Sequence, residues 1–331
     1  MSEFVTGDGR PPVNGSACPT GVTAVVLTYL RPRLAGDVTR SLIADEGMAG
    51  DHVVVVVNGQ GGLDDPDLEA SVHMVRLDRN TGPAGGFRAG METAFADPET
   101  EWVYLCEDDI GLFTLPSRRL TSVLDRLANR KGTSQPVGAV VAYGRNFVGR
   151  GAHTVNVVPA SGSTEEFLPV DVACWGATLV SRSVFEAGVL PDPDWFFGVE
   201  DFDFFCRVRK AGFEVLVDAE AARLVAAQQT SQGRDVAISS QRPNDAAEAW
   251  RAYYHARNSV ELARRHGHLS WHAWHVAYSA RHLQRAGSSA ERSAILHGLV
   301  DGARGRLGEN PRYVRRVGEF APPPGDSPAE R

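Results

Sequence analysis

Three consecutive carboxylates follow a short apolar run near the end of the first third of the chain. The run Trp-Val-Tyr-Leu-Cys occupies 102–106, and the acids are Glu107, Asp108 and Asp109. Neighbouring carboxylates repel one another, so they are tolerated where they share a cation or where the turn is fully solvated. In an extended backbone Glu107 and Asp109 point the same way and can face one divalent ion. Their hard oxygen atoms suit Mg²⁺ or Mn²⁺, whose other ligands beside a nucleotide are phosphate oxygens and water.

A second acidic group contains Glu200, Asp201 and Asp203. Apolar residues at helical spacing and a closing Gly212 predict a helix that begins near Glu200, which places these acids in its first turn. The helix dipole favours anions there. An ionised Asp201 or Glu200 can act as a general base towards a hydroxyl group, or can simply cap the helix. For Asp203 we favour capping, with an i,i+4 ion pair to Arg207.

A glycine-rich stretch reads Asn-Thr-Gly-Pro-Ala-Gly-Gly-Phe-Arg-Ala-Gly at 80–90. It does not match the P-loop of NTPases, and its glycines are spaced wrongly for the dinucleotide fingerprint. Glycines at the start of a helix still let the backbone approach a phosphate or a ribose. The alternative is a tight turn between a strand and a helix.

Aromatic and basic residues provide further candidates. Trp175 and Trp195 flank the second acidic group, and aromatic faces often line sugar sites, although packing in the core is the alternative for each. In a helix, Tyr254, Arg257 and Asn258 share one face. Arg257 can therefore bind a diphosphate or anchor the helix to the core.

The elements that must position these residues are predicted from apolar periodicity. Continuous apolar strands at 22–29, 52–57, 72–77 and 102–106 alternate with helices near 36–48 and up to 96. This alternation is typical of a mostly parallel sheet covered on both faces, so we predict an α/β fold. Further segments follow: a helix at 115–130 and strands at 137–143, 153–158, 167–174, 178–181 and 214–217.

The C-terminal part of the chain shows helical periodicity from 246 onward, with breaks at 267–268, 287–288 and near 308. We therefore expect a catalytic domain at 21–235 and a helical unit at 236–317. The ends, 1–20 and 318–331, have the Pro/Gly-rich polar composition of disordered tails.

Composition excludes some functions. The net charge of −7 argues against a dedicated nucleic-acid binder, although 245–316 carries twelve arginines and six acids, a local net of +6. Four scattered cysteines fit reduced thiols in a cytoplasmic protein. No signal sequence and no membrane-spanning segment is visible. The basic, aromatic helical unit is typical of a surface that rests on a membrane, so peripheral contact with the inner face is an expectation.

Four motifs in this order resemble family 2 glycosyltransferases with the GT-A fold, in the rhamnosyltransferase and galactofuranosyltransferase-like branch. The resemblance covers about 22–316. Its motifs are Thr-Tyr-Leu-Arg at 28–31, the glycine-rich stretch at 80–90, the acids at 107–109, and Gly-x-Glu-Asp-x-Asp at 198–203. The segment at 253–258 and the glycines at 298–308 are similar to the helical tail of the same branch. Three positions differ: relatives commonly have Asp at position 107, many carry Asp where Val57 stands, and many carry a His after the last strand.

The resemblance implies transfer of a sugar from a UDP- or dTDP-sugar, with inversion, to a hydroxyl of a lipid-linked glycan or a small molecule. Glu107 and Asp109 would hold the metal, Asp201 or else Glu200 would be the base, and Trp175 and Trp195 would border the acceptor. The nucleotide site would comprise Thr28, Tyr29, Arg31, Asn58, Asp78, Asn80, Gly82, Asp108 and Arg257.

Two other functions remain open from the sequence. A sugar nucleotidyltransferase shares the α/β sheet and the acidic metal site, but normally has a glycine-rich loop with a basic residue directly after the first strand. A nucleotide-sugar binding or scaffold protein without catalytic activity would use the same cleft.

Overall fold

An eight-stranded mixed sheet lies at the centre of the computed structural model, which describes residues 19–108, 119–130, 135–149, 153–231, 249–267 and 269–313. The strand order is β3-β2-β1-β4-β10-β5-β11-β8. In chain order the strands are β1 Val22–Thr28, β2 Val53–Asn58, β3 His73–Leu77, β4 Trp102–Glu107, β5 Val137–Val141, β8 Phe167–Pro169, β10 Thr178–Ser181 and β11 Glu214–Asp218.

The first four strands pair in parallel, so their carboxyl ends lie along one edge of the sheet. β10 inserts antiparallel between β4 and β5. Its register pairs Thr178 with Leu105, which brings the residues just before Thr178 beside the carboxyl end of β4. A small second sheet has the order β7-β6-β9, with β6 at Gly144–Phe147, β7 at Thr154–Asn156 and β9 at Val172–Ala173.

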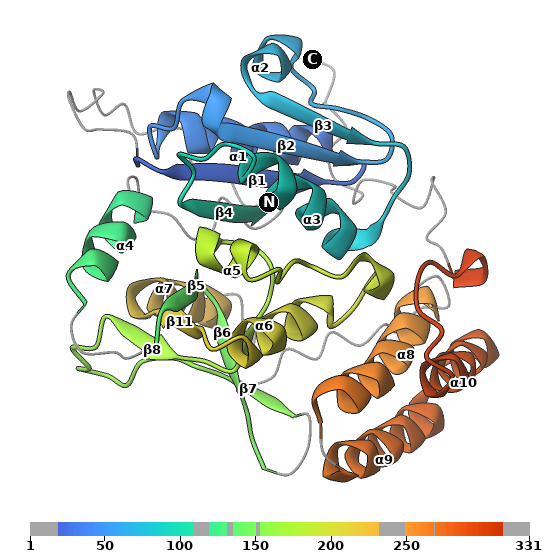
Figure 1. Cartoon of the computed structure of the whole chain (residues 1–331). Helices are drawn as coiled ribbons and strands as arrows, with labels where there is room; N and C mark the ends of the chain where they lie inside the picture. Colours follow the sequence, from blue (N-terminus) through green and yellow to red (C-terminus); the bar gives the residue numbers. More distant parts are fainter. Residues whose placement is uncertain are drawn as a thin grey trace, which may run out of the picture.

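Helices cover both faces of the large sheet (Figure 1). In β2, Val53 and Val55 face one hydrophobic core and Val54 and Val56 face the other, which is why the strand is apolar throughout. The first core includes residues of α1 (Pro32–Ala44), α4 (Arg119–Ala128) and α7 (Ala219–Ser231). The second includes residues of α3 (Gly82–Ala94), α5 (Arg182–Glu186) and α6 (Glu200–Lys210). The remaining short elements are η1 Gly50–His52, α2 Pro66–Ser71 and η3 Pro193–Trp195.

Three helices follow the sheet and form a separate layer, coloured orange to red in Figure 1. They are α8 (Ala249–His266), α9 (Leu269–Arg285) and α10 (Ser289–Ala303), followed by η5 (Pro311–Tyr313). The ring of Tyr253 stacks on that of Tyr313, with centroids 4.2 Å apart. Lys210 at the end of α6 donates to the carbonyl oxygen of Arg265, one of several contacts that join this helical unit to the sheet domain.

The predicted fold class is confirmed: the chain is α/β, with a mixed, mostly parallel sheet, helices on both faces and a C-terminal helical region. The breaks at 267–268 and 287–288 are also confirmed. Of the predicted tails, 1–18 and 318–331 lie outside the described residues, so their disorder stays a prediction.

Several predicted boundaries are wrong. The helix expected from 36 begins at Pro32, because proline suits the first turn of a helix. The strand expected at 167–174 divides into β8 and β9, which belong to different sheets. No helix was predicted from the sequence where the structure has α7. The strand expected at 153–158 contains only Thr154–Asn156.

Gly82 at the start of α3 lies very close to the loop that precedes α6. Its φ is +74°, and a Cβ there would collide with the carbonyl oxygen of Phe196. We expect Gly82→Ala to lower the free energy of unfolding by clearly more than the roughly 1 to 2 kcal/mol that a left-handed non-glycine residue costs. Urea unfolding measures this.

The matched control is Gly188→Ala. Gly188 has the same φ of +74°, but no atom lies within 4 Å of the position that a Cβ would take there. This variant should show only the backbone cost. Equal losses in the two variants would contradict the close approach of Gly82 and Phe196.

Candidate active site

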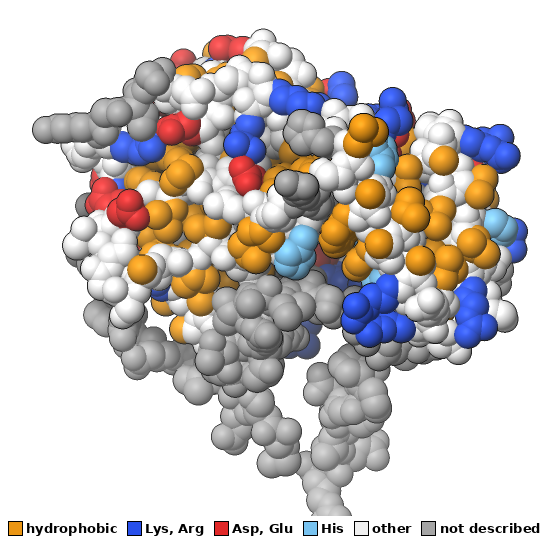
Figure 2. Space-filling model, turned by 90° about the horizontal axis from the view of Figure 1, so that it is seen from below, with side chains coloured by type: hydrophobic (Ala, Val, Ile, Leu, Met, Phe, Trp, Pro, Cys, Tyr) orange, Lys and Arg blue, Asp and Glu red, His pale blue; other side chains and the backbone are white. Residues whose placement is uncertain are grey.

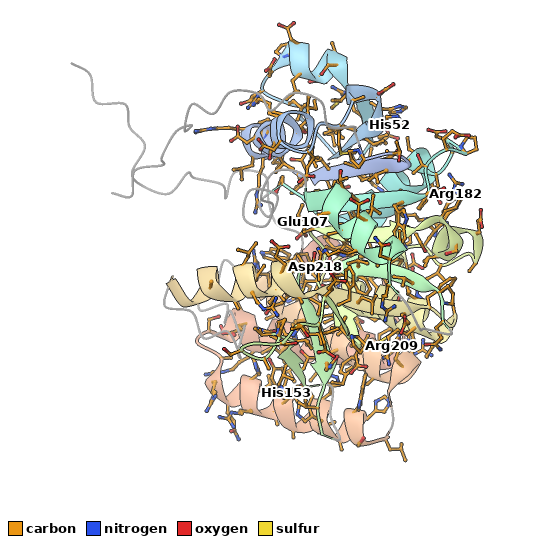
Figure 3. All side chains as sticks on the ribbon, turned by 90° about the vertical axis from the view of Figure 1, so that its left-hand side faces the viewer. His52, Glu107, His153, Arg182, Arg209 and Asp218 are labelled. Carbon is orange, nitrogen blue, oxygen red and sulfur yellow. The ribbon has the colours of Figure 1, made fainter. Side chains whose placement is uncertain are left out.

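A cleft of about 290 Å³ opens where the carboxyl ends of β1, β2 and β4 meet the helical unit. This edge of a parallel sheet is where α/β proteins usually bind ligands. Figure 3 shows Glu107, at the end of β4, between His52 above and Asp218 below. The cleft is lined by Leu27, Tyr29, Arg31, Asn58, Asn80, Gly82, Pro83, Glu107, Asp108, Phe196, Phe197, Trp250 and Arg251.

Asp108 joins the ends of two neighbouring strands. It is buried, and its two carboxylate oxygens accept from Thr28 Oγ1 at 2.8 Å and from Arg31 Nη1 at 3.0 Å. Hydrogen bonds between a guanidinium and a carboxylate are among the stronger ones in proteins. Asp108 therefore fixes Arg31 at the wall of the cleft, and Thr28 acts through Asp108.

Asn58 shapes the glycine-rich loop. Its amide nitrogen donates to Asn80 Oδ1 at 3.1 Å and to the carbonyl oxygen of Gly82 at 2.9 Å. Its amide oxygen accepts from the backbone and the hydroxyl of Thr81. Because Asn58 is 3% exposed and its amide is used in this way, it braces the turn that forms the floor of the cleft.

The remaining predicted nucleotide residues are placed differently. Tyr29, Asn80 and Gly82 line the cleft. Asp78 is exposed just after β3 and is not among the residues that line the cleft. Asp109 lies outside the described residues.

Arg257 is fully buried and makes contacts within the protein. Its guanidinium donates to the carbonyl oxygens of Trp195 and Gly308 and to Asn258 Oδ1. It is not among the residues that line the cleft. These are the contacts of an anchor, the second of the two roles expected for Arg257, rather than those of a residue open to a diphosphate.

Asn258 holds the same loop from the next position of α8. Its amide nitrogen lies 3.0 Å from the carbonyl oxygen of Trp195, 2.7 Å from that of Phe197 and 2.8 Å from that of Gly198. Arg257 and Asn258 together therefore satisfy carbonyl groups of the loop that leads directly into α6.

Both tryptophans expected at the acceptor side are packed inside the protein. Trp175 is 3% exposed, with its ring centroid 5.0 Å from that of Phe87 and 5.3 Å from that of Phe204. Trp195 is 0% exposed, beneath the guanidinium of Arg265. These are core positions, the alternative considered for each residue from the sequence.

Glu200, the first residue of α6, is a buried acid. It is 5% exposed, and among the described residues its Oε2 atom has no hydrogen-bond partner. Burial, followed by the charges of Asp201 and Glu107, raises the pKa of Glu200 well above its ordinary range, against the lowering effect of backbone hydrogen bonds. Glu107, at the end of β4, is therefore close enough to the start of α6 for its charge to raise the pKa of Glu200.

Asp201 has a more moderate shift. Burial raises the pKa of Asp201 to about 6, although hydrogen bonds from the Phe202 backbone and the Cys174 thiol, and the charge of Arg145, act in the opposite direction. The Phe202 N–H donates to Asp201 Oδ1 at 2.8 Å. Cys174 reaches Asp201 because it precedes β10, which runs back along β4.

Asp203, two residues further along the helix, shows the opposite behaviour. It accepts from Arg207 Nε at 2.7 Å, so the predicted i,i+4 pair is confirmed, and it lies 2.8 Å from His266 Nε2. Burial alone would raise the pKa of Asp203, but the hydrogen bonds and charges of His266 and Arg207 lower it. Asp203 is therefore a structural link between α6 and α8.

Backbone strain gathers around this group. The non-glycine residues with positive φ in the described part of the chain are Leu30, Ala177, Phe196 and Val199. Leu30 and Phe196 lie in loops that border the cleft and Val199 directly precedes α6, whereas Ala177 packs in the hydrophobic core just before β10. Such conformations cost of order 1 to 3 kcal/mol each and persist where the surroundings impose them, most often at functional sites.

A metal site is described only in part. Glu107 lines the cleft, whereas its predicted partner Asp109 lies outside the described residues. Within the ranges that the structure describes, no three His, Cys, Asp or Glu residues are grouped to hold a metal ion. The oxygen atoms of Glu107 suit Mg²⁺ or Mn²⁺.

The contribution of the helical unit to the lining of the cleft was not predicted from the sequence. Trp250 and Arg251 line the cleft, although the functional face assigned to this helix was that of Arg257. The two faces are distinguished by which one packs against the sheet domain, and a single helical pattern does not contain that information. The available signal was the Trp-Arg pair at 250–251, nearly two turns before Arg257.

The pKa of Asp201 predicts an unusual dependence of stability on pH. Because its pKa rises from 3.8 to about 6 on folding, the folded protein binds more protons than the unfolded chain between about pH 4 and 6. The contribution of Asp201 to stability therefore falls as the pH rises through that window. We expect Asp201→Asn to be more stable than the wild type at pH 7, by at most about 3 kcal/mol, and the difference to vanish near pH 4.

Asp203→Asn on the same helix is the control, because its lowered pKa gives the opposite sign. It should be less stable than the wild type at pH 7, and its deficit should stay nearly constant down to about pH 4 and shrink below that, where the unfolded carboxyl group takes up its proton. Urea unfolding at about pH 3, 4, 5.5 and 7 measures both variants. A loss of stability at pH 7 in Asp201→Asn would contradict the raised pKa.

Comparisons with known proteins show only distant likenesses. No protein-family model matches the chain, and no curated protein matches its sequence. Part of the chain is similar to GalNAc-T7 in a crystal structure with UDP, GalNAc and Mn²⁺, at 12% identity and a TM-score of 0.45, covering 61% of this chain and 43% of that chain. Part is also similar to A197 from STIV, at 12% identity and a TM-score of 0.34, covering 60% and 82%. The chain thus spans less than half of GalNAc-T7, and these likenesses establish neither a family nor a function.

Proposed function

We propose that this protein is an inverting glycosyltransferase of the GT-A type that uses a UDP- or dTDP-sugar. The observation that carries the proposal is the position of Glu107. It lines the cleft at the edge of the parallel strands, and its charge also acts on Glu200, the buried acid that precedes Asp201 at the start of α6. This supports a donor site that lies close to the candidate base.

The donor would occupy the cleft. Its volume of about 290 Å³ is at the lower end of the range for small-molecule sites, and it is open on one side to solvent. Tyr29 offers an aromatic face for a base, and Arg31, fixed by Asp108, offers a positive charge. Mg²⁺ or Mn²⁺ held by Glu107 and Asp109 would neutralise the departing diphosphate when bound.

Asp201 is the better candidate for the base. A general base works best when its pKa lies near the working pH, and that of Asp201 is about 6. Burial raises the pKa of Glu200 well above its ordinary range and so favours its protonated form, which makes Glu200 the weaker candidate. In the proposed reaction the acceptor oxygen bonds to the anomeric carbon, the bond to the diphosphate breaks, and Asp201 takes the hydroxyl proton. A single displacement of this kind inverts the anomeric centre.

The acceptor is proposed to be a lipid-linked glycan at the inner face of a membrane. In the described residues, no helix is long and apolar enough to cross a bilayer. The outer face of α9 nevertheless exposes Leu269 by 88% and Val276 by 70%, and the nearby Arg281 and Arg285 are also exposed. Figure 2 shows apolar side chains gathered over this helical unit, to the right of the view, with basic side chains at the lower margin. Such a surface fits an anionic membrane.

The catalytic role is tested with Asp201→Asn. We expect transfer, or hydrolysis of the donor, to fall by about 10² to 10⁴-fold, the usual contribution of a general base. Binding of the nucleotide sugar should persist, because Asp201 is not among the residues that line the cleft. Product analysis measures turnover, and thermal shift with a panel of UDP- and dTDP-sugars, with and without Mn²⁺, measures binding.

Asp37→Asn serves as a control with the same change of charge: Asp37 is partly exposed, pairs with Arg40 and is not among the residues that line the cleft, so turnover should stay intact. Unchanged turnover in Asp201→Asn would contradict its role as base. Release of pyrophosphate from a nucleoside triphosphate and a sugar 1-phosphate would instead indicate a nucleotidyltransferase. Binding of a donor without any turnover would indicate a binding or scaffold protein.

The membrane surface is tested by vesicle sedimentation. The wild type should bind vesicles that contain anionic lipid, and the double variant Leu269→Glu/Val276→Glu should bind at least about ten-fold more weakly, because burying each apolar side chain is worth roughly 1.5 to 3 kcal/mol. The matched control is Leu34→Glu/Val158→Glu, which changes exposed residues outside the helical unit. Equal binding by both double variants would contradict the assignment of this face.

A further inference from the structure

Arg251 is held at the wall of the cleft by two aromatic rings. Its guanidinium carbon lies 5.2 Å from the ring centroid of Trp250 and 5.8 Å from that of Phe197. These two rings are themselves in contact, with centroids 4.7 Å apart. A guanidinium group within about 6 Å of an aromatic face is attracted to the ring, so the two rings help to fix the position of Arg251.

The charges of the residues that line the cleft indicate what Arg251 can bind. Its described lining residues carry two carboxylates, Glu107 and Asp108, and two guanidinium groups, Arg31 and Arg251. Arg31 forms an ion pair with Asp108 at 3.0 Å, so the charges of those two residues largely offset each other. A donor diphosphate brings further negative charge beside Glu107. Arg251 is a second guanidinium group among the lining residues, and its positive charge attracts a diphosphate bound in the cleft.

Arg251 differs in its surroundings from Arg257, which lies further along α8. Arg257 is fully buried and donates to carbonyl oxygens of the protein, whereas Arg251 is partly exposed and lines the cleft. The planar guanidinium matches a phosphate group with two parallel hydrogen bonds. Arg257 follows Arg251 by six positions, and this spacing places the two side chains on different faces of the helix.

We propose that Arg251 binds the diphosphate of the donor nucleotide, so that the helical unit supplies part of the donor site. This inference rests on the proposed function and extends it to a residue outside the sheet domain. The cleft would then be closed on one side by β1 and β4 and on the other by the first turn of α8.

The experiment compares nucleoside diphosphates with monophosphates. Isothermal titration calorimetry with UDP, UMP, dTDP and dTMP is carried out on the full chain. For Arg251→Gln we expect the affinity for the better diphosphate to fall by about 10 to 100-fold, the value of one charge-assisted hydrogen-bond pair. The affinity for the matching monophosphate should change by less than about two-fold, because the diphosphate's outer phosphate is then absent.

Arg251→Lys keeps the charge without the planar fork, and its loss should be intermediate. Arg304→Gln, which removes an exposed arginine at the end of α10, is the matched control and should bind like the wild type. Thermal unfolding of each variant shows whether the fold is kept. If Arg251→Gln does not fold, Arg251→Lys makes the same comparison, and a selective loss of diphosphate affinity supports the proposal.

The assignment of Arg251 is overturned if the folded variant binds diphosphate as well as the wild type does. It is also overturned if affinity for diphosphate and monophosphate falls equally, because Arg251 would then act on the nucleoside or on the shape of the cleft. If the wild type binds none of the four nucleotides, the donor site itself is wrong, and the role of Arg251 fails with it. The last outcome differs from the first two, so the failure of the proposed function is recognisable.

Discussion

The structure of the candidate site depends on how α8 holds the loop at 195–199. Carbonyl groups of this loop would otherwise be buried without partners, and Arg257 and Asn258 satisfy them. Removing a buried donor from such a network costs about 1 to 3 kcal/mol for each orphaned group. The loop carries Phe196 and Phe197 into the cleft and leads directly to Glu200 and Asp201. One pair of side chains therefore positions both the aromatic wall and the acids.

The acids of α6 show how one helical turn provides different chemical environments. Glu200 faces the interior beside Glu107, Asp201 is partly compensated by a thiol and a backbone N–H, and Asp203 is paired with a cation. The helix dipole acts on all three in the same direction. Their differences therefore arise from burial and neighbours, which depend on the approach of β10 to β4 and of α8 to α6.

Much of the sheet was predictable from the sequence, because a strand buried on both faces is largely apolar. β1, β2 and β4 have this composition, and the polar residues at their carboxyl ends meet at one edge of the sheet. Tyr29, Asn58 and Glu107, expected at the site from the family resemblance, line the cleft at that edge. The acids of α6 were recognised because charges in a first helical turn are a local pattern.

The remaining features depend on contacts between distant segments. Whether Arg251 or Arg257 faces the cleft is decided by how α8 is rotated against the sheet domain, and both faces of that helix contain aromatic and basic residues. The division of 167–174 between two sheets is decided by pairing with β11 and β6, which the local sequence does not encode.

The bond between Asn258 and the loop before α6 also has a consequence for the order of synthesis. A ribosome completes β4 and α6 well before it reaches residue 258, and chains fold progressively from the N-terminus as they emerge. A nascent chain that ends before α8 contains all the acids of the site but not the side chains that fix their loop. The acids and the cleft would thus reach their final geometry only late in translation, after α8 has emerged.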